Sequence, residues 1–152
     1  MKDQDIMRLA EKYRLAIETA KNDGQFIDDE RFRYFPHACC GDTCDLLAEY
    51  LKHFGIETVY YCGKRKGWSH AWLVINDGRI HRPQTIVNQY PKELWSTLKS
   101  YGMGNPEEPI HFTKYGRADL SDGLIIDITG DQFEDYFERV YVGKMDFCSL
   151  NC

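Results

Sequence analysis

Residues 35–55 read FPHACCGDTCDLLAEYLKHFG, in which three cysteines lead directly into a helical pattern. The apolar residues of its second half recur every three or four positions and predict a helix with one buried face. They are Leu47, Tyr50, Leu51 and Phe54. Gly55 suits the position just after a helix, so we expect the helix to end at Gly55. Its start is expected near residues 40–43. A thiol at a helix start can act as a nucleophile, because the helix dipole and the unpaired N–H groups of the first turn stabilise a thiolate.

The rest of the chain combines another helix with short strands. An amphipathic helix is expected over residues 4–21, and shorter helical pieces over 91–101 and 131–137. Strand patterns occur in ETVYYCG (57–63), WSHAWLVI (68–75), RIHR (79–82), IHFTKY (110–115), GLIIDIT (123–129) and RVYVG (139–143). An Asn-Asp-Gly turn at 76–78 is typical of antiparallel strands. The sequence therefore predicts an α+β fold in which the cysteine helix packs on a mainly antiparallel β-sheet. The aromatic residues that precede the helix are expected to pack in the core: Phe26, Phe32, Tyr34 and Phe35.

Length and charge limit the classes of function. A chain of 152 residues predicts a single domain over residues 1–152. The net charge of −5 is spread along the sequence, with KRK at 64–66 as its basic run, so neither nucleic acid nor a membrane is an expected partner. The first residues lack the apolar core of a signal peptide, and no segment approaches the roughly 20 apolar residues of a membrane span. We therefore expect a cytoplasmic protein.

Six cysteines, at positions 39, 40, 44, 62, 148 and 152, allow two kinds of chemistry. Without a secretion signal, free thiols are the expected state. Zinc is an alternative, since Cys40-x3-Cys44 and Cys148-x3-Cys152 together could supply four thiolates. Zinc ligands usually lie on tight knuckle turns, whereas Cys44 is expected inside a helix, so the sequence favours a nucleophile over a metal ligand.

A thiol nucleophile needs a base, and the base needs a group that fixes its orientation. His70 begins the strand SHAWLVI, and Asp127 lies within the strand GLIIDIT. If these strands are neighbours, both side chains can lie over the start of the cysteine helix. Each residue also has an ordinary structural explanation: Cys40 as a small buried side chain, His70 as a hydrogen-bonded strand residue, and Asp127 as a turn cap.

The segments FPHACCGDTCDLL, GIETVYYCG, SHAWLVI and GLIIDITGDQF resemble the bacterial branch of the transglutaminase-like, papain-like cysteine enzyme superfamily. The resemblance covers residues 35–76 and 123–133, and residues 77–122 look like a family-specific insertion. It implies a papain-like fold with Cys40 as the nucleophile, His70 as general base and acid, and Asp127 as the residue that orients His70. Cys39 and Asp131 are the neighbouring alternatives for the first and third roles, but Cys40 directly precedes a glycine as the motif requires.

The implied function is thiol-dependent acyl transfer on an amide bond, without a cofactor. Its substrate could be a peptide or protein, a glutamine side chain, or a small amide, so the activity could be that of a peptidase, deamidase or transglutaminase. Two features depart from the family pattern. Asp42 places a negative charge near the thiol, and no glutamine precedes Cys40 to supply an oxyanion donor, which leaves the backbone N–H of Cys40 for that role. The alternative class is a binding module that keeps the fold without catalysis.

Overall fold

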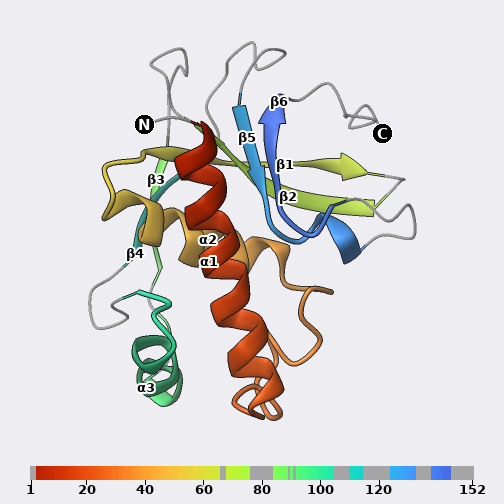
Figure 1. The fold of residues 1–152 in the computed structure, drawn as a ribbon, viewed down its shortest axis with the longest axis vertical. Helices are drawn as coiled ribbons and strands as arrows, with labels where there is room; N and C mark the ends of the chain where they lie inside the picture. The colour runs from red at the N-terminus through yellow and green to blue at the C-terminus, as the bar shows by residue number, and fades with distance from the viewer. Residues whose placement is uncertain are drawn as a thin grey trace.

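The structure, a computed structural model, describes residues 3–65, 68–75, 84–88, 90, 92–104, 110–114, 124–132 and 138–144. Of residues 62–65, 68, 84–88 and 110–114 it describes the backbone only. The element order is α1 (Asp3–Asn22), α2 (Cys40–Lys52), β1 (Thr58–Arg65), β2 (Trp68–Ile75), β3 (Gln84–Asn88), α3 (Lys92–Ser100), β4 (Ile110–Lys114), β5 (Leu124–Asp127), the 3-10 turn η1 (Gly130–Gln132) and β6 (Tyr141–Lys144). The fold is α+β, as the sequence predicts (Figure 1).

The described strands form one six-stranded sheet in the order β3-β4-β1-β2-β5-β6. Neighbouring strands run antiparallel except for β1 and β4, which are parallel. The β2–β5 pairing aligns Leu73 with Ile126 and Val74 with Ile125. This register brings the start of β2 and the end of β5 together at one end of the sheet, because antiparallel partners run in opposite directions.

The β3–β4 pair lies within residues 77–122, the predicted insertion, and extends the sheet beyond β1. Strand β3 was not expected from the sequence, because its short run has no clear alternation and its backbone is paired only by the distant β4. The predicted strand RIHR and the turn at 76–78 lie outside the described residues, as do residues 133–137 of the predicted helical turn. That 77–122 is an insertion, and that the chain is one domain, stay predictions.

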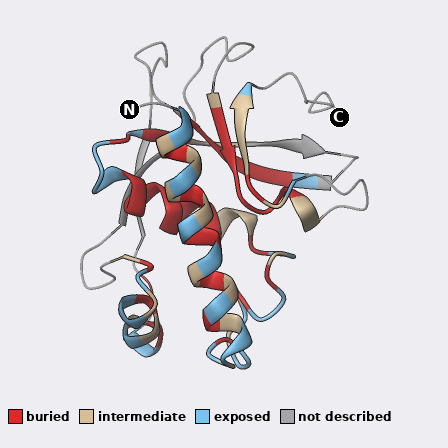
Figure 2. Cartoon of the chain, viewed as in Figure 1, coloured by how far each residue is buried: buried red, intermediate tan, exposed pale blue. Residues whose placement is uncertain are grey.

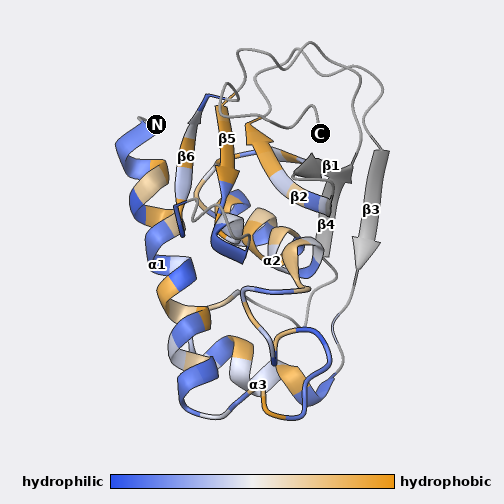
Figure 3. Cartoon of the chain, turned by 90° about the vertical axis from the view of Figure 1, so that its right-hand side faces the viewer, coloured by the Kyte–Doolittle hydropathy of each residue, from blue (hydrophilic) through white to orange (hydrophobic). Residues whose placement is uncertain are grey.

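The helices α1 and α2 cover the sheet. Helix α2 contacts β2, β1 and β4, and α1 contacts α2 and β6. Figure 1 shows α1 crossing α2, and Figure 2 shows that buried residues gather along α2, β2 and β5. Figure 3 shows apolar stretches on β2, β5 and α2, and these elements contribute residues to one buried cluster. None of the described helices is both long and apolar enough to cross a lipid bilayer.

The start of α2 at Cys40 and the burial of Leu47 and Leu51 confirm the predicted helix. Two aromatic residues depart from expectation, since Phe54 is 45% exposed and Tyr34 is 60% exposed. Phe54 lies beyond the last helical residue, in the turn that ends with Gly55 at a φ of +78°. The other predicted core aromatics are buried: Phe26, Phe32 and Phe35.

Candidate active site

Cys40 is the first residue of α2, and Cys39 is the residue that caps it. The first backbone hydrogen bond of the helix runs from the N–H of Thr43 to the carbonyl of Cys39. The N–H groups before Thr43 therefore have no partner within the helix and can interact with a thiolate or an oxyanion. Cys39 is buried, and the hydroxyl of Thr43 donates to its sulfur at 3.6 Å. Cys40 is half-buried.

The pKa values of the two neighbouring thiols are shifted in opposite directions. Burial raises the pKa of Cys39 to about 12, despite the hydrogen bond from Thr43. Burial also acts to raise the pKa of Cys40, but a hydrogen bond with His70, the charge of that ring, and hydrogen bonds from the backbone of Ala71 and Gly41 outweigh it. The net pKa of the Cys40 thiol lies below its ordinary value. Cys40 is therefore the more acidic thiol of the pair, and a lower pKa favours the thiolate form.

His70 and Asp127 are brought together by neighbouring strands at the end of the sheet. Nε2 of His70 lies 2.7 Å from Oδ2 of Asp127, and both residues are 1% exposed. Burial alone would lower the pKa of His70, but hydrogen bonds with Asp127 and Cys40 and the charges of both groups raise it to about 9. The carboxylate is fixed in turn, because its Oδ1 accepts a 3.0 Å hydrogen bond from the backbone N–H of Thr129.

The three residues predicted from the sequence thus lie in one connected group: the thiol of Cys40 meets the ring of His70, which meets the carboxylate of Asp127. Trp72, two residues after His70 on β2, is 1% exposed, and its ring centroid lies 5.8 Å from that of His70. It packs beside the histidine. The side chain of Trp68 lies outside the described part of the chain.

Asp42, the acidic residue in the first turn of α2, lies close to a positive charge. Oδ1 of Asp42 lies 3.9 Å from Nε of Arg31, and both side chains are partly exposed. Burial raises the pKa of the Asp42 carboxyl, and Arg31 opposes that shift. The backbone carbonyl of Asp42 accepts a 3.0 Å hydrogen bond from the hydroxyl of Tyr90. The negative charge that the sequence places beside the thiol is thus partly offset by Arg31.

Two residues at the site were missed by the sequence analysis. Nε2 of Gln132, on η1, lies 3.1 Å from Nδ1 of His70. Arg14, on α1, is 3% exposed and contacts the turn that follows β5. Gln132 comes five residues after Asp127 within the GDQF segment, so its closeness to Asp127 in the chain was the available signal. Arg14 lies on the apolar face of an amphipathic helix, which is an unusual position for a charged residue.

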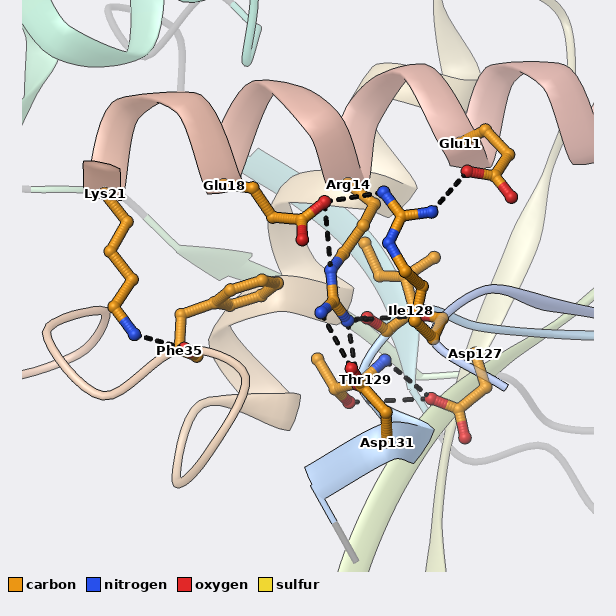
Figure 4. Close-up of polar contacts among 10 residues, drawn as sticks. Glu11, Arg14, Glu18, Lys21, Phe35, Asp127, Ile128, Thr129 and Asp131 are labelled. Atoms are coloured by element: carbon orange, nitrogen blue, oxygen red, sulfur yellow. Dashed lines mark hydrogen bonds and ion pairs between the residues drawn. The ribbon is translucent and has the colours of Figure 1, made fainter. Parts of the chain in front are cut away.

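Arg14 holds the turn between Asp127 and Gln132 through a set of hydrogen bonds (Figure 4). Its guanidinium forms a bidentate pair with Asp131, with two N–O distances of 2.8 Å, and donates to the carbonyl of Ile128 at 2.7 Å. Its Cζ lies 4.7 Å from the ring centroid of Phe35, in the segment that leads to the cysteines. Asp131, the alternative to Asp127 in the sequence analysis, is therefore engaged by Arg14, and Asp127 is the carboxylate that meets His70.

Replacing Arg14 with methionine is expected to lower the free energy of unfolding by about 3 kcal/mol, because it leaves the partly buried Asp131 carboxylate and the Ile128 carbonyl without their donor. Urea denaturation followed by circular dichroism measures the change. Arg8→Met is the matched control on the same helix: Arg8 is 78% exposed and pairs with Asp5 at 3.4 Å, so its loss should cost less than about 1 kcal/mol. Equal effects of the two variants would contradict the anchoring role of Arg14.

The described cysteines Cys39, Cys40 and Cys44 are free. Among the residues that the structure describes, no group of three His, Cys, Asp or Glu side chains is arranged to hold a metal ion. Cys148 and Cys152, which complete the alternative zinc site, lie outside the described residues, as does the side chain of Cys62. Zinc binding and the redox state of those three cysteines stay predictions.

Comparisons of the chain with protein-family models, with curated proteins and with solved structures found no match. The resemblance to transglutaminase-like enzymes therefore depends on the motifs around Cys40, His70 and Asp127. Membership of that family stays a prediction, and the contacts among these three residues are what bears on function.

Proposed function

We propose that the chain is a thiol-dependent acyl-transfer enzyme with a Cys-His-Asp triad of the transglutaminase-like, papain-like kind. The observation that carries the proposal is the placement of Cys40 at the start of α2 against a His70 ring that Asp127 holds at 2.7 Å. The lowered pKa of Cys40 and the raised pKa of His70 favour a thiolate–imidazolium pair. Such a pair is reactive at neutral pH without a cofactor.

In the proposed reaction, Sγ of Cys40 attacks the carbonyl carbon of an amide, and the C=O π electrons move to the oxygen. The backbone N–H of Cys40 is the proposed donor to this oxyanion. The C–N bond then breaks as protonated His70 gives its proton to the departing nitrogen, which leaves a thioester on Cys40. Water or an amine attacks the thioester with His70 as base, and Sγ leaves. Asp127 holds the ring with Nδ1 toward the sulfur throughout.

A peptide bond, a glutamine side chain or a small amide would each fit this chemistry, so peptidase, deamidase and transglutaminase activities all follow from it. The partition of the thioester separates hydrolysis from transfer, because water gives an acid and an amine gives a new amide. The cytoplasmic location and the absence of nucleic acid as a partner remain expectations from the sequence.

A reaction with 4-nitrophenyl acetate tests the proposal without knowledge of the natural substrate. We expect a burst of about one nitrophenolate per chain, because deacylation of a thioester is slower than its formation from an activated ester. Peptide mapping should find the acetyl group on Cys40. Added glycine methyl ester should then yield its N-acetyl derivative if the enzyme is a transferase, and free acetate should dominate if it is a hydrolase. Acetylation no faster than that of the unfolded chain would favour the non-catalytic binding module.

A further inference from the structure

The carboxamide of Gln132 lies at the ring nitrogen through which His70 would exchange a proton with Cys40. Asp127 engages Nε2 of His70 at 2.7 Å, and Nε2 of Gln132 lies 3.1 Å from Nδ1. The thiol of Cys40 also hydrogen-bonds to the same ring. Because Asp127 engages the other nitrogen, Cys40 and Gln132 both approach Nδ1.

The two groups cannot use that nitrogen in the same way at the same time. In a neutral imidazole that donates from Nε2 to Asp127, Nδ1 carries one lone pair, and the amide N–H of Gln132 can donate to it. When the S–H bond of Cys40 breaks and its proton forms an N–H bond at Nδ1, the lone pair is gone. The amide N–H then faces another donor, so the carboxamide has to present its oxygen or move away.

We propose that Gln132 is a positioning residue of the Cys40–His70 pair: its amide donates to Nδ1 whenever the His70 ring is unprotonated, and it competes with Cys40 for that nitrogen. The contact stabilises the unprotonated ring and the uncharged thiol, and so opposes the thiolate–imidazolium pair that Asp127 and Cys40 favour. The inference deepens the proposed acyl-transfer function and rests on it for its catalytic meaning. The proton moves from sulfur to nitrogen, and no electron transfer is involved.

The position of Gln132 is fixed by its neighbours. The preceding residue, Asp131, is held in the bidentate pair with Arg14, and the backbone N–H of Gln132 donates to the carbonyl of Thr129 at 3.2 Å. Gln132 is half-buried. An anchored backbone limits the positions that the carboxamide can reach. The distance between the carboxamide and His70 is therefore set by the turn as well as by the side-chain rotamer of Gln132.

Few of the titratable groups around the Cys40–His70 pair can exchange a proton with it near neutral pH. Asp127 faces His70 from β5, and Cys39, Asp42 and Cys44 lie on or beside α2. Burial raises the pKa of Cys44 well above its ordinary value and that of Cys39 to about 12, so both stay protonated near neutral pH. The exchange near neutral pH therefore runs between Cys40 and His70.

Titration of His70 by nitrogen NMR tests the proposal, because the ¹⁵N shifts of the imidazole report its protonation and tautomer. In Gln132→Ala we expect the pKa of His70 to rise above its starting value of about 9 by roughly half a unit to one unit, because the unprotonated ring loses a hydrogen bond. Gln132→Glu should raise it further, since a carboxylate accepts a hydrogen bond from the protonated ring. Gln4→Ala, an exposed glutamine of α1, should leave it unchanged.

A purely structural role predicts the opposite sign, because loosening the turn would weaken the contact with Asp127 and lower the pKa of His70. A fall or no change in Gln132→Ala would therefore overturn the proposal. Alkylation of Cys40 by iodoacetamide, followed by peptide mapping of the same samples, separates the two proposals. Rapid alkylation with an unchanged His70 titration removes the role of Gln132 alone. Slow alkylation with the expected shift keeps the Gln132 contact and argues against the acyl-transfer function.

Discussion

Replacing Cys40 with alanine is expected to abolish acetylation by 4-nitrophenyl acetate and all turnover that depends on a thioester. Without its sulfur the site has no nucleophile, and we expect a loss on the order of 10⁴-fold or more, as for catalytic nucleophiles in general. Cys40→Ser should be nearly as inactive, because a hydroxyl beside His70 is far less ionised than a thiol at neutral pH. Stopped-flow measurement of nitrophenolate release gives the rate, and urea denaturation checks that the fold is retained.

Cys39→Ala is the matched control, one residue away in the chain. Cys39 is 2% exposed, and its sulfur accepts from Thr43 rather than His70, so we expect most of the activity to remain. The variant removes a buried sulfur atom, so a modest loss of stability of about 1 kcal/mol is expected. Full activity in Cys40→Ala together with an inactive Cys39→Ala would place the nucleophile one residue earlier.

The second large effect is expected from Asp127→Asn, which should cost on the order of 10²–10⁴ in rate while the chain stays folded. An amide in place of the carboxylate can donate to Nε2, which favours the tautomer with its proton on Nδ1 and leaves no acceptor for the proton of Cys40. His70→Ala should cost at least as much. The pre-steady-state acetylation rate measures both.

The double variant distinguishes a catalytic unit from two independent contributions. If Asp127 acts through His70, adding Asp127→Asn to His70→Ala should change the rate little, because members of one unit are strongly non-additive. Multiplicative losses would contradict that assignment. Asp131→Asn should give a contrasting pattern, because it weakens the pair with Arg14. We expect it to lower the free energy of unfolding and to leave the acetylation rate of the folded protein nearly unchanged.

The part of the site that could be predicted came from local patterns. The start of α2 follows from apolar spacing and a terminal glycine, and His70 and Asp127 lie on strands whose apolar runs are visible in the sequence. Their meeting required the further assumption that these strands are neighbours, and the β2–β5 pairing meets it.

The features that were missed depend on contacts between distant parts of the chain. Arg14 and Asp131 are 117 residues apart, and neither carries a local signal of the pairing. Strand β3 is specified by its pairing with β4, and residues 89–109 separate the two strands in the sequence. Phe54 and Tyr34 are exposed because of where α2 ends and how the loop before it runs. The apolar character of a residue does not determine either of these.

Because Arg14 on α1 anchors the turn after β5, the stability of the turn is coupled to that of the helix. Helix α1 and the turn after β5 share a buried charged contact, so opening one of them removes a stabilising partner from the other. The two segments should therefore behave as one unit in native-state fluctuations, although most of the chain separates them. We therefore expect the lifetime of the His70–Asp127 contact to depend on the local opening of the first helix as well as on the strands that carry the two residues.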